Sequence, residues 1–242
     1  MTMTVPIINC GDASVEAMEA FTSFFEALPS YIHKGLEEHG YQVVVGRFLS
    51  SCHAELKGSD RNAGGFAPTL NRMFFAEYFQ HETGKINTTL DKNCFPHEAG
   101  HFVDLVLAGT GKWPDGYSSD REPFKGAAEQ DIECLAKDDY KHVREAAARI
   151  FKDDAEKAKY LLSHFKQAFV DNARREREIY AEIFANIFGQ NHGAYFPIQP
   201  LFPRCAALVQ ADHARFEKAA QPQRSLTQRV MHHIKKIAPG LP

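Results

Sequence analysis

The sequence predicts an α+β fold, with a small antiparallel or mixed sheet followed by a mainly helical C-terminal half. Two runs rich in β-branched and aromatic residues, 41–49 and 72–78, predict strands. From about residue 90 onward the chain instead carries helical patterns, with apolar residues three and four positions apart. Both strands precede the long helices, and the sequence contains no repeat, long linker or low-complexity segment. One α+β domain is the simplest interpretation.

The N-terminal part of the chain predicts two helices before the first strand. Apolar residues within 13–40 recur at helical spacing, Pro29 restarts the chain, and Gly40 ends the second helix. After the first strand, 57–65 predict a polar, glycine-rich loop and 66–71 carry residues typical of turns. The second strand follows directly.

The C-terminal half predicts several helices separated by loops rich in glycine and proline. Such loops cover 109–126 and 189–204, and helical patterns cover 127–152, 154–170 and 173–189. Shorter helices finish the chain near Pro239. We expect one domain over 1–242, divided into N-terminal helices (1–40), a sheet with the first long helix (41–108), a helical subdomain (127–190) and C-terminal helices (205–242).

Composition excludes several classes of protein. The chain has 242 residues, 44% of them hydrophobic, so it is long enough to bury one sizeable core. Its net charge of −3 gives no general attraction to nucleic acid, and no apolar run approaches the roughly 20 residues that span a bilayer. Five scattered cysteines without a CxxC pair favour reduced thiols. The N-terminus does not resemble a Sec signal peptide, so we expect a cytoplasmic protein or one secreted by a leaderless route.

The strongest motif is an HExxH with the sequence His97-Glu98-Ala99-Gly100-His101. On a helix, residues four apart share one face, so the two histidines can bind a single Zn²⁺ ion. Glu98 then lies beside the metal, where its carboxylate can take a proton from water. An apolar pattern continues after the motif, as expected for a helix that runs into a core. We therefore predict zinc as the cofactor and Glu98 as the general base.

The third zinc ligand has two candidates. Glu178 belongs to the segment EIYAEIF, where apolar neighbours surround two carboxylates four residues apart. Glu178 can complete the metal site, and Glu182 can accept a hydrogen bond from a ligand histidine and so orient its ring. The alternative ligand is Asp104, which shares the helix face of the motif but lies a turn beyond His101 on a short side chain. The metzincin pattern, with a third histidine six residues after the motif, is excluded by Leu107.

Three segments occur in an order that resembles a known family. They are GGFAPTLNRMFFAEY (64–78), HEAGHFVD (97–104) and EIYAEIF (178–184). Together they resemble the catalytic domain of the anthrax-lethal-factor-like metallopeptidases, a gluzincin family that includes the Pro-Pro endopeptidases. The resemblance covers about 65–190, in patches. It implies a zincin-like catalytic domain in which His97, His101 and Glu178 bind zinc.

The resemblance also implies how a substrate binds. In the family, the turn GG-aromatic-x-P-x-x-N leads into a strand that borders the active site. That strand corresponds to Met73, Phe74, Phe75 and Ala76, which would form an edge strand that pairs with an extended peptide. One position departs from the family, because its tyrosine seven residues before the ligand glutamate, thought to stabilise the oxyanion, is Asp171 here. The candidates to replace that tyrosine are His164, His192 and Tyr195.

The predicted function is a zinc-dependent endopeptidase that hydrolyses a peptide or protein substrate through metal-activated water, of the kind found in bacterial effectors or toxins. The alternative is a non-catalytic interaction protein on a degenerate zincin scaffold, which the missing tyrosine favours. Retention of Glu98 argues against this alternative, because a degenerate site has no need of a general base.

Overall fold

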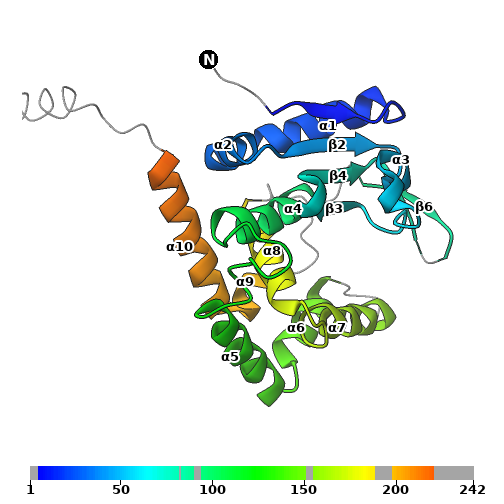
Figure 1. Cartoon of the computed structure of the whole chain (residues 1–242). Coiled ribbons are helices and arrows are strands. Elements are labelled where there is room, and N and C mark those ends of the chain that lie inside the picture. The colour runs from blue at the N-terminus through cyan, green and yellow to red at the C-terminus, as the bar shows by residue number, and fades with distance from the viewer. Residues whose placement is uncertain (1–4, 82, 90–93, 151–154, 189–197, 221–242) are drawn as a thin grey trace, which may run out of the picture.

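The computed structural model describes residues 5–81, 83–89, 94–150, 155–188 and 198–220 (Figure 1). Its strands are β1 (Ile7–Asn9), β2 (Gln42–Gly46), β3 (Gly64–Ala67), β4 (Arg72–Ala76), β5 (Tyr78–Gln80) and β6 (Ile86–Thr88). Its α-helices are α1 (Val15–Glu26), α2 (Ser30–Glu38), α3 (Leu49–Cys52), α4 (Cys94–Phe102), α5 (Phe124–Lys137), α6 (Lys141–Ile150), α7 (Ala155–Phe169), α8 (Arg175–Phe188), α9 (Ile198–Leu201) and α10 (Pro203–Ala220). A π-helical turn, η3 (Val103–Leu107), continues α4.

The main sheet is mixed, which confirms the predicted α+β class. Its strand order is β1-β2-β4-β3, with β1, β2 and β4 parallel and β3 antiparallel to β4. β5 and β6 form a separate antiparallel pair. The two predicted strands correspond to β2 and β4. The prediction of a loop at 57–65 and a turn at 66–71 is wrong in part, because β3 is formed there.

The central strands of the sheet are buried on both faces. Alternate side chains of β2 and β4 join the main core, together with residues from α1, α2, α4 and α8. The intervening side chains pack under α3 in a smaller apolar cluster. Strands buried on both faces have continuous apolar sequences rather than alternating ones, which explains the runs VVV in β2 and MFFA in β4.

The helix pair α4 and α8 lies between the sheet and the helices α5, α6 and α7 (Figure 1). Gly100 permits its close packing. A Cβ atom at this position would lie 2.7 Å from Cα and 3.0 Å from the carbonyl oxygen of Ala181. Because both are backbone atoms, no side-chain movement would relieve the contact. Gly100 thus allows α4, which carries the HExxH motif, to pack closely against α8.

The predicted helix over 127–152 is divided in two. Asp139 and Tyr140, between α5 and α6, have φ angles of 46° and 55°. Right-handed helix cannot continue through left-handed backbone, so the chain turns there. The predicted helices over 154–170 and 173–189 correspond to α7 and α8. The segment 221–242 lies outside the described residues.

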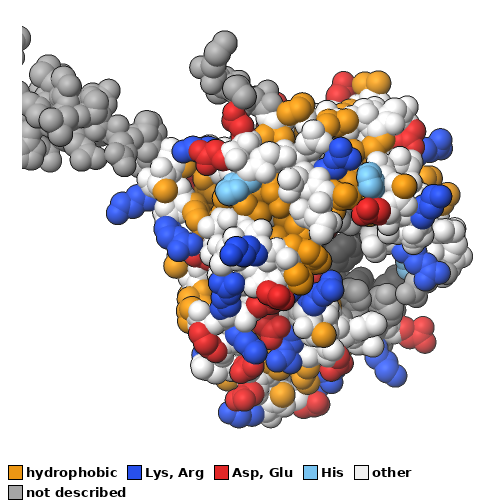
Figure 2. All heavy atoms as spheres, in the orientation of Figure 1, with side chains coloured by type: hydrophobic (Ala, Val, Ile, Leu, Met, Phe, Trp, Pro, Cys, Tyr) orange, Lys and Arg blue, Asp and Glu red, His pale blue; other side chains and the backbone are white. Residues whose placement is uncertain are grey.

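The charges on the visible surface are of mixed sign. Figure 2 shows Lys and Arg side chains interspersed with Asp and Glu over the helical part of the molecule. This pattern agrees with the small net charge of −3. No helix in the described ranges is long and apolar enough to cross a membrane.

Candidate metal centre

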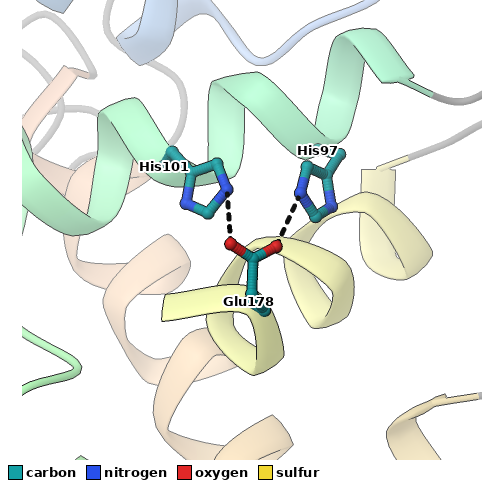
Figure 3. Close-up of side chains that lie close together, drawn as sticks. All are labelled: His97, His101 and Glu178. Carbon is teal, nitrogen blue, oxygen red and sulfur yellow. Dashed lines mark ion pairs between the residues drawn. The ribbon is translucent and has the colours of Figure 1, made fainter. Parts of the chain in front are cut away.

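Three predicted ligands from two helices meet at one point (Figure 3). His97 and His101 project from α4, and Glu178 projects from α8. One carboxylate oxygen of Glu178 lies 3.4 Å from Nε2 of His97, and the other lies 3.8 Å from Nε2 of His101. One ligand atom from each residue lies within 4.8 Å of the other two. The structure therefore assembles the cluster that the sequence predicts.

The donor set fits a zinc ion. Zinc bonds to imidazole nitrogen and carboxylate oxygen are about 2.0–2.2 Å long, so adjacent ligands of a tetrahedral site lie roughly 3.3–3.5 Å apart. The contacts of Glu178 with His97 (3.4 Å) and with His101 (3.8 Å) use different carboxylate oxygens and lie at or somewhat above this value. Two histidines and one carboxylate leave the fourth tetrahedral position open, which is the pattern of catalytic rather than structural zinc sites.

A second carboxylate fixes the ring of His97. Nδ1 of His97 lies 3.2 Å from Oε2 of Glu182, as predicted for a residue that orients a metal ligand. The amide of Asn186 in turn donates to the backbone carbonyl of Glu182 at 3.0 Å and lies 3.5 Å from its Oε1. A proton on Nδ1 leaves the lone pair of Nε2 pointing into the cluster. Asn186 was not predicted, although its position four residues after Glu182 places it on the same helix face.

The three ligands have strongly shifted pKa values in the metal-free site. Burial acts to lower the pKa of His97, but hydrogen bonds to Glu178 and Glu182 outweigh it and raise this pKa above its ordinary value. Burial acts to raise the pKa of Glu178, whereas His97 and His101 lower it to about 2. Burial and the neighbouring charge of His97 lower the pKa of His101 to about 3. Glu178 and His101 are therefore in the protonation states that metal binding requires.

Glu98, the predicted general base, is almost completely buried between α4 and β3. The backbone N–H of Phe66 lies close enough to this carboxylate to lower its pKa. Cγ of Glu98 would lie 3.2 Å from a Cβ atom at Gly64, so that the first glycine of the GG pair leaves room for this side chain. Burial raises the pKa of Glu98 to about 7, with opposing effects from His97 and Glu178. The carboxyl group is thus poised to exchange a proton near neutral pH.

The prediction that Met73, Phe74, Phe75 and Ala76 form a substrate-binding edge strand is wrong. β4 is paired on both sides, with β2 and β3, and all four side chains are fully buried. The edge strand beside Glu98 is β3 instead. A continuous apolar run is typical of a strand covered on both faces, and this signal in MFFA could have excluded the edge position.

Among the described residues, no strand pairs with the outer edge of β3, which presents backbone groups beside Glu98 and is called the free edge below. The N–H of Ala76 donates to the carbonyl of Ala63. In the register of β3 and β4 these two residues lie opposite each other, so they form a hydrogen-bonded pair of the antiparallel ladder. Because such pairs alternate, Gly64 and Phe66 direct their N–H and C=O groups away from β4. The effect of the Phe66 backbone on the pKa of Glu98 agrees with this geometry.

The alternative ligand Asp104 lies outside the cluster. Its side chain is fully buried and accepts hydrogen bonds from N–H of Ser119 at 2.8 Å and Oγ of Ser119 at 2.5 Å. Burial raises the pKa of Asp104 to about 8, against the effect of these hydrogen bonds. Asp104 therefore connects η3 to the following loop rather than facing His97, His101 and Glu178.

The candidates to replace the tyrosine of the resembled family are not placed in the site by the described residues. His192 and Tyr195 lie outside the described residues. His164 belongs to α7, but its side chain is not among those described. Asp171, at the position of the tyrosine, is exposed.

Comparison with known proteins gives no assignment. No protein-family model matches the chain, and no curated protein matches its sequence. The function therefore has to be inferred from the site itself.

Proposed function

We propose that the chain is a zinc-dependent endopeptidase of the gluzincin type with a zincin-like catalytic domain. Nε2 of His97, Nε2 of His101 and the carboxylate of Glu178 would hold the ion. When bound, zinc supplies Lewis acidity, which lowers the pKa of water toward about 7 and polarises a carbonyl group. The observation that carries the proposal is the convergence of these three ligands beside a buried carboxylate at a free sheet edge.

The chain's own residues account for substrate binding and proton transfer. An extended peptide can add to the outer edge of β3 through backbone hydrogen bonds at Gly64 and at the carbonyl group of Phe66, whose N–H faces Glu98. Glu98 would accept the proton of the attacking water and then deliver it to the leaving amine nitrogen. Glu182 would hold the ring of His97 through Nδ1. No covalent intermediate with the protein is required.

Metal content and turnover together test the proposal. We expect the purified protein to contain about one Zn²⁺ per chain, measured by mass spectrometry of the metal. Hydrolysis of a proteome-derived peptide library should fall by orders of magnitude in Glu98→Gln, while metal content and fold stay unchanged. Turnover equal to that of the wild type would remove Glu98 from the mechanism.

A non-catalytic interaction protein is the second candidate, because the exposed Asp171 stands where the resembled family has tyrosine. This function predicts zinc binding without hydrolysis of any peptide, in wild type and Glu98→Gln alike. The same two measurements therefore separate the two functions.

A further inference from the structure

An aromatic and basic surface adjoins the metal cluster, and the proposed mechanism does not use it. Its exposed members are Trp113, whose side chain is 40% accessible, and Arg174. The guanidinium carbon of Arg174 lies 5.9 Å from the centroid of the Trp113 ring, and that of Arg177 lies 6.0 Å from it. Below them, Arg177 stacks on Tyr117 at 4.1 Å. We call Trp113 and Arg174 the Trp–Arg surface.

The Trp–Arg surface lies at the His101 end of the cluster. The N–H of Glu178 donates to the carbonyl of Arg174, so Arg174 is one helical turn before the third ligand and shares its side of the helix. α4 and α8 run antiparallel, since His97 contacts Glu182 whereas His101 contacts Glu178. Arg174 therefore lies beyond His101, away from the supporting pair of Glu182 and Asn186.

Arg174 is an exposed cation of this region, and its charge also acts to lower the pKa of Glu178. Nε of Arg177 lies 3.0 Å from both carboxylate oxygens of Asp120, so this neighbouring guanidinium is fully paired. Arg175 pairs with Glu176 at 3.0 Å. No ion pair joins Arg174 to a carboxylate within the described ranges. Asp120 and Glu176 are therefore engaged by other arginines.

The chemistry of the Trp–Arg surface selects a carboxylate. A guanidinium can bind a carboxylate through two parallel hydrogen bonds, and a tryptophan ring packs against the methylene groups that carry it. We infer that Trp113 and Arg174 form a subsite for an acidic side chain, Glu or Asp, of a peptide bound at the metal centre. This inference rests on the proposed function, because it places the peptide beside the zinc ligands. It adds a substrate class, which the ligands and Glu98 do not specify.

Trp113 is also the reporter, because it is the one tryptophan of the chain. The probes are acetylated and amidated alanine hexapeptides that carry one Glu at each of the six positions in turn, with a matched Gln series. Titrations followed by tryptophan fluorescence use zinc-loaded Glu98→Gln, so that no peptide is consumed. For at least one position, we expect the Glu peptide to bind about three- to tenfold more tightly than its Gln partner. About 1 M salt should abolish this preference.

Two variants test whether Arg174 is responsible. Arg174→Gln should make the Glu and Gln peptides bind equally, and Arg174→Lys should keep part of the preference because it retains the charge without the planar fork. The control Lys34→Gln removes an equal charge from α2, where Lys34 forms an exposed pair with Glu38. This control should keep the full preference.

The outcomes separate this inference from the proposed function. Equal binding of Glu and Gln peptides by the parent protein, or the lack of any saturable fluorescence change, overturns the subsite even if peptides are hydrolysed. An equal loss for all peptides in Arg174→Gln also overturns it, since the guanidinium would then act at the reacting bond. A Glu preference without hydrolysis by the wild type supports the subsite and removes the peptidase instead.

Discussion

The two histidines of the cluster share one carboxylate but have different surroundings. His97 contacts Glu178 through Nε2 and Glu182 through Nδ1, so both ring nitrogens are held. His101 contacts Glu178 alone among these acids, and its pKa falls to about 3. The His97 ring is therefore oriented by a second carboxylate, whereas no second carboxylate contacts His101 in the described residues. The difference shows that the two histidines of one motif can be supported unequally.

Loss of Glu178 should affect both ends and have the largest effect. Glu178→Ala leaves two histidines, and we expect zinc affinity to fall by more than the about 100-fold typical of losing a supporting residue. Chelator competition measures the affinity. Glu176→Ala is the control, because Glu176 is on the same helix but pairs with Arg175. If Asp104→Ala released the metal while Glu178→Ala retained it, the ligand set would be wrong.

Separation of α4 from α8 should also disturb both ends. Gly100→Ala places a methyl group against the backbone of Ala181, and we expect about 1–3 kcal/mol less stability in urea unfolding together with weaker zinc binding. Gly126→Ala is the matched control within a helix. The Cβ atom there meets the flexible carboxylate of Glu122, which can move away. We expect this control to be neutral or more stable by up to about 1 kcal/mol. Similar losses in both variants would show that the close helix contact is not specific.

Changes at Glu182 should affect the His97 end alone. Glu182→Ala removes the partner of Nδ1, and zinc affinity should fall by about 10–100-fold. Asn186→Ala leaves that carboxylate in place and removes its support, so a smaller loss is expected. In chelator competition, Asn186→Ala should therefore bind zinc most tightly of the three variants, Glu182→Ala more weakly, and Glu178→Ala most weakly. The reverse order for Glu182 and Asn186 would contradict the proposed support of His97.

A change at Asp104, three residues after His101, should have the smallest effect on zinc binding. It should instead alter how the stability of the protein depends on pH. The pKa of Asp104 is raised by burial to about 8, above its value of about 3.9 in an unfolded chain. Between these values the folded state holds one more proton, so the metal-free protein should lose stability as pH rises through this window. Asp104→Asn should flatten that loss, as measured by urea unfolding at pH 5 and pH 8. Parallel pH profiles for the two proteins would exclude Asp104 as the cause.

Each pair of candidate residues was predictable because helical spacing places its two members on one face of a helix. His97 and His101 are four residues apart, as are Glu178 and Glu182, and the structure joins the two pairs. The free edge of β3 was not predictable in this way. Strand order depends on which chains pair across the sheet, and GGFA lacks the apolar pattern that marks a strand. Only the buried run in β4 signalled that the edge lies elsewhere.

The contact between Phe66 and Glu98 also escaped prediction. It depends on a backbone N–H, which every residue except proline possesses, and therefore leaves no mark in the sequence. The glycine that makes room for Glu98 was visible as part of the GG pair. A Cβ atom at Gly64 would lie only 3.2 Å from Cγ of Glu98, which explains why glycine fits at this position.

The free edge of β3 has a consequence for the rate at which a target protein would be cut. Backbone groups at Gly64 and Phe66 can pair only with a segment whose own N–H and C=O groups are not engaged elsewhere. In a folded target, such a segment becomes available through local unfolding, and the open population then scales the rate of cleavage. Under the proposed function, a destabilising mutation in the target could therefore accelerate its own degradation without altering the cleaved sequence.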